Sequence, residues 1–293
     1  MRRRRGGLAA LVPGLWLALF FAFPFLLVAK LSLSHTALAM PPYAPQLDLA
    51  AGWPGLVETV RGFDLATYRR LIDDPLYLKA FASSLGLAGA ATGLLLLIGY
   101  PIAYGVTRFR PATRRLLILA IALPFWTSSL IRIYAWIAIL KPAGLLNKAL
   151  GLLGLPALNI LNTNAAVLLG LVYAYLPFMV LPLYAVLDRQ DAALLEAAQD
   201  LGASPRQVFW RVTFPLSLPG AAAGALLCFI PMVGEFVIPD LLGGSGTLML
   251  GRSIWTEFFA NRDWPTASAV ALVMLAALLI PILLVQRHAR VAP

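Results

Sequence analysis

Long runs of hydrophobic residues recur along the chain and are separated by shorter polar segments. A helix needs about 20 apolar residues to cross a bilayer. The runs that are long enough lie at residues 8–33, 80–106, 116–140, 164–187, 216–240 and 266–286. The pattern therefore predicts an all-α membrane protein with six transmembrane helices.

Composition agrees with this pattern. Of the 293 residues, 60% are hydrophobic and 12% are charged, and the mean hydropathy is +0.83. These values lie far outside the range of soluble domains. Cys228 is the single cysteine, and inside the fifth run it is predicted to be a small apolar filler. We therefore expect an integral membrane protein that is surrounded by the lipid bilayer.

The distribution of arginines predicts which side of the membrane each loop faces, because cytoplasmic loops carry an excess of lysine and arginine. Arginines gather before the first run, after the second, in the fourth loop and at the C-terminus: Arg2–Arg5; Arg108, Arg110, Arg114 and Arg115; Arg189, Arg206 and Arg211; Arg287 and Arg290. Both termini are therefore predicted to be cytoplasmic. The net charge of +10 is then mostly a topology signal, and we expect no nucleic-acid partner.

Residues 188–215 form the only long charged segment with a helix-forming sequence. Asp191 can cap the start of a first helix, and Gly202 stands where a left-handed residue would end that helix. Ser204, followed by Pro205 and Gln207, predicts a second helix that begins with a capping box. The segment is therefore predicted to be two short helices joined by a tight bend.

The first of these helices carries features of a docking surface. Ala197 and Ala198 would let another protein approach the backbone closely, and Glu196 places a carboxylate at the rim. A solvated hairpin without a partner is the alternative. The spacing of Glu196-Ala197-Ala198, Gly202 and Val212-x-Phe214-Pro215 resembles the EAA signature of membrane subunits of ATP-binding-cassette (ABC) importers.

This resemblance implies a type I ABC importer permease fold whose coupling helices, in the loop 188–215, dock on a cytoplasmic ATPase dimer. The residues that it assigns to coupling are Glu196, Ala197, Ala198, Gly202 and Pro215. The sequence has no G-x-x-x-x-G-K-[ST] phosphate loop, so this chain is not predicted to hydrolyse ATP. ATP and Mg²⁺ are expected on the partner ATPase. His35 and His288, the only histidines, are predicted near opposite faces of the membrane, so no catalytic or metal site is expected in this chain.

Three charged residues are predicted to lie inside the membrane: Arg132 in the third run, and Glu235 and Asp240 in the fifth. A charge near the bilayer centre costs about 2.5–3.5 kcal/mol on insertion scales. One interpretation is an ion pair between Arg132 and either carboxylate. The other is a pathway for an organic cation, because prolines and glycines interrupt the fifth run and nearby aromatic rings can attract cations. Those rings, which can equally pack helices, belong to Trp126, Tyr134, Trp136, Tyr173 and Tyr175.

A second resemblance concerns the substrate. Residues 124–134, 234–244 and 261–265, together with Trp255, are similar to the putrescine and spermidine importer permeases, and we expect the similarity to cover essentially the whole chain. It implies a permease of the bacterial inner membrane that imports a polyamine. The implied partners are a second homologous permease subunit, the ATPase dimer and a periplasmic polyamine-binding protein.

These assignments divide the chain into three parts. Residues 1–79 are expected to hold a retained N-terminal transmembrane helix and a periplasmic segment, 80–286 the ABC transmembrane domain, and 287–293 a cytoplasmic tail. The periplasmic segment is expected to contain a short helix at 64–72, and residues 142–163 a short re-entrant or interfacial piece. The prolines expected to break the first half of the periplasmic segment are Pro41, Pro42, Pro45 and Pro54.

Other functions remain open at this point. A permease for another small solute, such as ferric iron, a phosphonate or an opine, would share the same fold. An ATP-independent secondary transporter or channel would not need the hairpin at 188–215. A membrane-embedded enzyme is disfavoured because the sequence lacks a histidine or nucleophile constellation.

Overall fold

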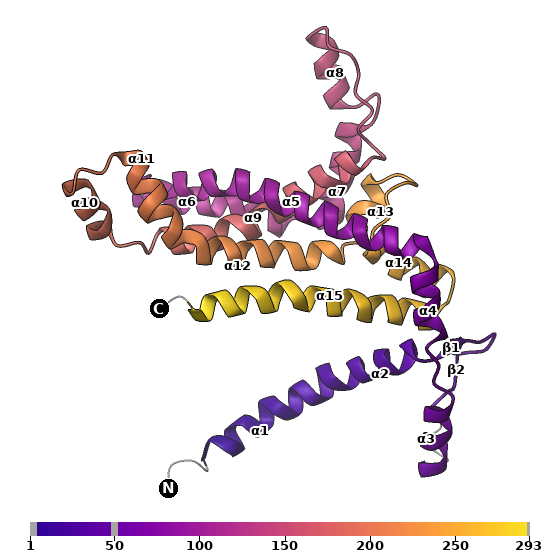
Figure 1. The fold of residues 1–293 in the computed structure, drawn as a ribbon. Helices are drawn as coiled ribbons and strands as arrows, with labels where there is room; N and C mark the ends of the chain where they lie inside the picture. The colour runs from indigo at the N-terminus through magenta and orange to yellow at the C-terminus, as the bar shows by residue number, and fades with distance from the viewer. Residues whose placement is uncertain (1–4, 48–51, 292–293) are drawn as a thin grey trace. The chain divides into compact units, whose positions relative to one another are not determined.

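The computed structural model describes residues 5–47 and 52–291, with side chains described for 11–47, 52–280, 282 and 283. The described chain is almost entirely helical (Figure 1). It forms two compact units. The first comprises Met1–Ala80 and Ser253–Ala277, and the second Phe81–Arg252 and Leu278–Pro293.

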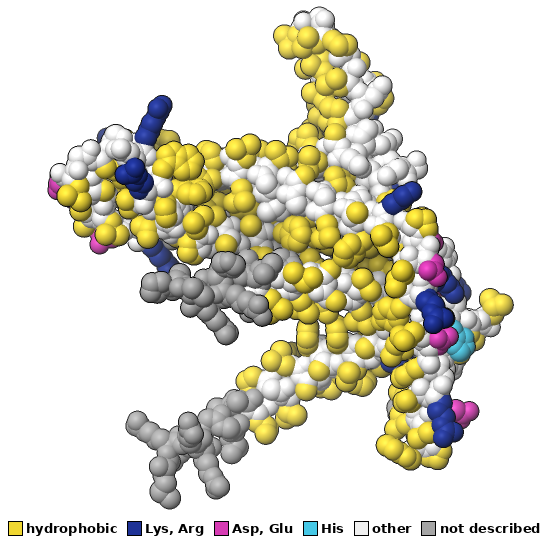
Figure 2. Space-filling model, viewed as in Figure 1, with side chains coloured by type: hydrophobic (Ala, Val, Ile, Leu, Met, Phe, Trp, Pro, Cys, Tyr) yellow, Lys and Arg dark blue, Asp and Glu magenta, His cyan; other side chains and the backbone are white. Residues whose placement is uncertain are grey.

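The first unit begins with a long apolar helix. α1 (Arg5–Leu17), a π-helical turn (Ala18–Ala22) and α2 (Phe23–Ser32) follow one another without a break. The stretch Leu11–Ser32 is long and apolar enough to span a membrane, as predicted for the first run. Figure 2 shows hydrophobic side chains along this helix. Arg2–Arg4 lie outside the described residues, as does the side chain of Arg5.

The segment after α2 departs from the all-α prediction. β1 (His35–Thr36) and β2 (Tyr43–Ala44) form a short antiparallel pair. α4 (Ala66–Asp73) confirms the helix predicted at 64–72. α3 (Gly52–Arg61) contains Pro54 in its first turn, so the expected break at that proline is wrong. A first-turn proline is tolerated because its missing N–H would have no partner within the helix.

The second unit is built around three long helices. These are α5 (Pro75–Thr107), which begins in the first unit, α9 (Asn164–Leu187) and α12 (Phe214–Val233). Small residues set the distance between α9 and α12. A Cβ added at Gly220 would lie 2.9 Å from the Val186 side chain, and one at Gly224 would lie 3.0 Å from the Met179 sulfur. Small residues let apolar helices pack closely where water provides no driving force.

The third predicted span is interrupted. α6 (Pro111–Ala122) and a 3₁₀ turn (Leu123–Trp126) are separated from α7 (Ser129–Leu140) by two residues with extended or irregular backbone. The prediction of one continuous helix over 116–140 is therefore wrong. The stretch that is long and apolar enough to span is instead Ser129–Leu152, which includes α8 (Leu145–Leu152).

The fifth predicted span ends early. The long helical stretch is Pro205–Val233, and the backbone leaves the helix at Gly234. α13 (Val237–Leu242) and α14 (Leu250–Trp255) follow. Glu235 and Asp240 therefore lie beyond the end of this continuous helix, which corrects the bounds predicted for the fifth span, 216–240.

The last helix, α15 (Trp264–Val291), covers the sixth predicted span after a π-helical turn (Thr256–Ala260). Its apolar part, counted over described residues, is Trp264–Ile280. The described part of the chain thus contains five helices that are long and apolar enough to cross a membrane, and this shorter sixth. The side chains of Arg287 and Arg290 lie outside the described residues.

Candidate functional site

The hairpin at 188–215 has the predicted caps. The Asp191 carboxylate accepts a hydrogen bond from the Ala193 N–H at 3.0 Å, at the start of α10 (Ala192–Asp200). Gly202 follows this helix with a φ of +83°. Ser204 and Gln207 form a complete capping box at the start of α11 (Pro205–Val208). Because each cap closes within a few residues, the bend is specified by local sequence.

The base of the hairpin is tied to the neighbouring helices by contacts that the sequence did not reveal. The Gln190 amide donates to the Thr213 carbonyl at 2.9 Å. Arg114 forms an ion pair with Asp188 and also donates to the Thr107 carbonyl at 2.7 Å. Arg114 therefore anchors the hairpin in addition to its place among the arginines that indicate membrane topology.

The tip of the hairpin is open. The side chains of Glu196 and Ala197 are exposed, and that of Ala198 is half-buried. Leu201 is 89% exposed, although it is a large hydrophobic residue between two helices. A Cβ at Gly202 would meet no atom within 4 Å. Pro215, the second residue of α12, is also exposed. The predicted docking residues therefore lie on a surface with room for another molecule.

A second candidate site is a partly open cavity of about 550 Å³ within the second unit, lined by residues of α7, α9, α12 and α13 together with Phe125. Arg132 and Glu235 both line it. Its aromatic lining consists of Phe125, Trp136, Tyr173, Tyr175 and Phe178. The structure thus brings a positive and a negative side chain into one cavity whose remaining walls are mostly apolar.

Glu235 is held firmly at the break between α12 and α13. One carboxylate oxygen accepts from the Tyr175 hydroxyl at 2.9 Å, and the other from the Val237 N–H at 3.0 Å. The peptide that carries Glu235 is also in close contact with α14. A Cβ added at Gly251 would lie 2.3 Å from the Gly234 carbonyl oxygen and 2.5 Å from that of Glu235. Only glycine permits this approach.

Arg132 does not form the predicted ion pair. Within the described part of the chain it makes no salt bridge, and its Nε is buried without a hydrogen-bond partner. Its guanidinium carbon lies 5.9 Å from the centre of the Phe125 ring. The interpretation of Arg132 as the fixed partner of Glu235 or Asp240 is therefore wrong in this conformation.

Asp240 has a different role from Glu235. It forms an ion pair with Arg252 at 3.2 Å, with 52% of its side chain exposed. It does not line the cavity. The ion-pair partner of Asp240 is therefore Arg252, twelve residues later in the chain, and not Arg132.

The aromatic residues divide into two groups. Trp136 and Tyr173 pack edge to face with ring centres 5.4 Å apart, and they line the cavity. Trp126 and Tyr134 are 81% and 58% exposed and are not part of the cavity lining. Of the aromatic residues weighed for a cation path, the structure brings Trp136, Tyr173 and Tyr175 together and leaves Trp126 and Tyr134 outside.

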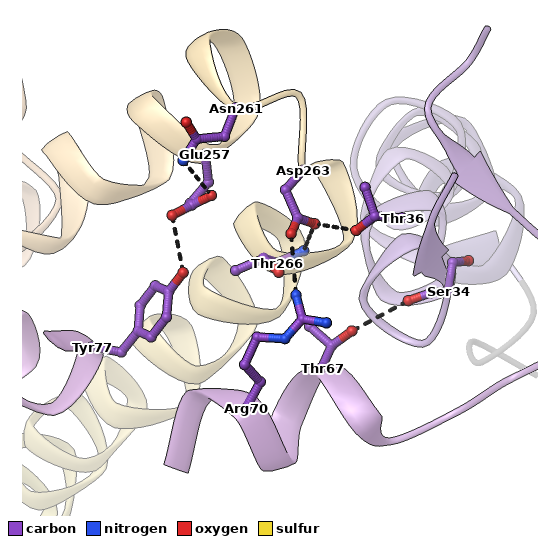
Figure 3. A network of polar contacts seen from close by, with 9 residues as sticks. All are labelled: Ser34, Thr36, Thr67, Arg70, Tyr77, Glu257, Asn261, Asp263 and Thr266. Carbon is purple, nitrogen blue, oxygen red and sulfur yellow. Dashed lines mark hydrogen bonds and ion pairs between the residues drawn. The ribbon is translucent and has the colours of Figure 1, made fainter. Parts of the chain in front are cut away.

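The first unit contains a polar cluster of another kind (Figure 3). Asp263 accepts hydrogen bonds from the Thr36 hydroxyl at 2.8 Å and the Thr266 N–H at 3.0 Å, and it pairs with Arg70 at 3.4 Å. Glu257 accepts from the Tyr77 hydroxyl at 3.0 Å and from the Asn261 amide. No group of three or more His, Cys, Asp or Glu among the described residues could hold a metal ion.

The chain matches a known protein family and is similar to transport permeases. Residues 95–292 match the family described as binding-protein-dependent transport system inner membrane component. The chain is 49% identical to the spermidine/putrescine transport system permease protein PotB of Haemophilus influenzae, over 71% of this chain and 74% of that protein. It is 42% identical to PotB of Escherichia coli K12, over 78% of this chain and 83% of that protein. The expectation that the resemblance covers essentially the whole chain is too broad.

The fold is also found among solved structures. A bacterial ABC transporter involved in the import of the acidic polysaccharide alginate contains a chain that matches with a TM-score of 0.73 at 18% identity. The match covers 100% of this chain and 98% of the other. It confirms the predicted ABC importer permease fold.

Proposed function

Because the chain belongs to the family of binding-protein-dependent transport system inner membrane components, we propose that it moves a polyamine, putrescine or spermidine, from the periplasm to the cytoplasm. It is a multi-pass permease of an ABC importer and not an ATPase. The identity of 42% and 49% to PotB proteins, whose name states spermidine and putrescine, supports this substrate class.

The observation that carries the proposal is the carboxylate of Glu235 in an aromatic-lined cavity between candidate spans. A polyamine is an apolar chain that carries ammonium groups. Glu235 would accept hydrogen bonds from one ammonium, and Trp136 or Tyr173 would add a cation–π attraction of about 0.5–2 kcal/mol. The methylene groups would lie against apolar walls such as Leu226 and Ile230.

Other subunits complete the transporter in this proposal. An ATPase dimer docks on the hairpin at 188–215, through Glu196, Leu201 and the open space at Gly202. A second homologous permease packs beside this chain, and a periplasmic binding protein delivers the polyamine. Both termini and the hairpin face the cytoplasm, which the arginines near the hairpin support.

Uptake by Glu235→Gln tests the cavity assignment. The change removes the negative charge but keeps the size of the side chain, so an ammonium would lose a charge-assisted hydrogen bond of about 1.5–3 kcal/mol. We expect polyamine uptake by the complete transporter in proteoliposomes to fall about tenfold or more. Asp240→Asn is the matched control, because Asp240 lies outside the cavity, and it should retain most of the uptake. Parental uptake by Glu235→Gln, measured per amount of inserted protein, would contradict the proposal.

A further inference from the structure

The cavity holds two opposite charges that are not paired with each other. Glu235 is engaged by Tyr175 and Val237, whereas the buried Nε of Arg132 has no acceptor. Arg132 also forms no salt bridge with any residue in the described part of the chain, so its charge has no anionic partner there. A diamine would satisfy only the carboxylate and would leave Arg132 as it is.

We propose that this cavity also accepts zwitterionic amines, with the ammonium at Glu235 and an acidic group at Arg132. The ligand class is an unbranched ω-amino carboxylate. Its carboxylate would receive N–H groups from the two terminal guanidinium nitrogens of Arg132, since the Nε is buried, and this two-point geometry is one that arginine favours for carboxylates. The inference rests on the proposed function to the extent that both ligands use Glu235.

Electrostatics favour such a ligand. Arg132 and Glu235 give the charged lining of the cavity a net charge of zero. A zwitterion places each of its charges next to the opposite charge of the protein. A dication gains one attraction, and its second ammonium is repelled by Arg132 unless that end lies outside the cavity. Discrimination between the two ligands therefore depends on Arg132, which the polyamine pathway does not require.

The walls between the two charges restrict the shape of the ligand. Apolar side chains on α12, among them Leu226, Leu227 and Ile230, and the packed rings of Trp136 and Tyr173 line the remaining surface. They offer few hydrogen-bond partners to a branched polar ligand, but they can contact a methylene chain. Within a homologous series of ω-amino carboxylates, affinity should therefore pass through a maximum at the chain length that reaches both charges.

Binding to the purified permease–ATPase complex in nanodiscs, without the binding protein, tests the inference. Radiolabelled putrescine and the series of ω-amino carboxylates are measured by equilibrium dialysis. We expect Arg132→Gln to weaken binding of the best zwitterion at least tenfold and to leave putrescine affinity unchanged or tighter. Glu235→Gln should weaken both ligands. Lys148→Gln removes an exposed positive charge on α8 and should change neither.

The outcomes separate the two proposals. Equal zwitterion affinity of the parental and Arg132→Gln complexes, or no zwitterion binding at any chain length, overturns the inference. If the Glu235→Gln complex binds putrescine with the parental affinity, the polyamine assignment is contradicted and the zwitterion inference is judged by Arg132→Gln. If Arg132→Gln does not fold, Arg132→Lys keeps the charge without the two-point geometry and should give an intermediate loss. Displacement of radiolabelled putrescine from the parental complex gives an independent readout. A zwitterion that displaces putrescine shares Glu235 with it, whereas one that binds without displacing putrescine contradicts the inference.

Discussion

Asp263 in the first unit and Glu235 in the second are both carboxylates held by hydrogen bonds, but their surroundings differ. Asp263 receives a hydroxyl, a backbone N–H and a guanidinium, and only 16% of its side chain is exposed. Glu235 receives two donors and borders a cavity. An ionised carboxylate has about four acceptor positions. A carboxylate whose partners come from several segments of the chain orders the fold, whereas one with unused acceptor positions facing a cavity can also bind a ligand.

The exposed Glu196, which has no hydrogen-bond or ion-pair partner among the described residues, extends this comparison. Variants of the hairpin at Glu196 and Gly202 should have the largest effect on transport. Glu196→Lys, and separately Gly202→Asp, should insert normally but abolish substrate-stimulated ATP hydrolysis and uptake by the complete transporter. Gly202 has a φ of +83°, so a side chain there costs about 1–2 kcal/mol in the backbone. Glu58→Lys, the same charge change at an exposed position of α3, is the control. Normal coupling in both hairpin variants would remove the docking assignment.

Asp263→Ala should lower the stability of the folded protein, whereas Glu235→Gln should lower uptake. The change leaves Thr36, Thr266 and Arg70 without their acceptor, and we expect a loss of about 2–3 kcal/mol of unfolding free energy. The Arg70 ion pair adds little to this figure because Arg70 is largely exposed. The unfolding temperature of purified protein should fall by several degrees, while Glu235→Gln should unfold near the parental temperature. Equal unfolding temperatures for Asp263→Ala and the parent would abolish the distinction.

Tyr175→Phe sharpens the comparison at the cavity. It removes the hydroxyl that orients Glu235 but keeps the carboxylate and its charge. A lost hydrogen bond of about 0.5–1.5 kcal/mol should raise the KM for uptake about threefold to tenfold and change kcat little. Tyr134→Phe serves as control because Tyr134 is 58% exposed and lies outside the cavity lining. A similar KM in the two variants would show that Tyr175 does not position Glu235.

The smallest effect is expected when Arg132→Leu and Glu235→Leu are combined and the unfolding free energy is compared with that of each single variant. Arg132→Leu and Glu235→Leu would compensate each other in stability if the residues formed a fixed ion pair. Since they do not pair in the structure, the double variant should recover no unfolding free energy relative to the more damaging single variant, because no buried charge is left unpaired by either single change. Thermal or denaturant unfolding of the two single variants and the double variant measures this. Substantial recovery in the double variant would restore the ion-pair interpretation.

The hairpin and the cavity also differ in how far the sequence could predict them. The caps at Asp191 and Ser204 close over two or three residues, so the chain itself specifies them. The bond from Tyr175 to Glu235 joins residues 60 positions apart. No spacing rule relates such positions, because their proximity results from the packing of α9 beside the end of α12. The sequence supplied the charged and aromatic residues of the cavity but not their partners.

Hydropathy predicted the spans better than their breaks. The predicted spans 116–140 and 216–240 continue through 127–128 and 234–236, where the helices stop. Prolines do not distinguish these breaks, since Pro177 and Pro182 lie inside α9, which is continuous. A helix in an apolar environment ends where another element can take over its hydrogen bonds. At the second break, the Glu235 side chain accepts from Val237.

The glycine at position 251 has a mechanical consequence. At most contacts between helices, flexible side chains absorb small displacements by changing rotamer. At Gly251 the backbone of α14 lies directly on the carbonyl groups of Gly234 and Glu235. This contact, which we call the Gly251 joint, contains no side chain that could absorb a displacement. The preceding residue is anchored as well, because the Leu250 N–H donates to the Ser84 hydroxyl at 2.7 Å. The joint is therefore stiff, and a displacement of the first turn of α14 must shift the Glu235 peptide with it.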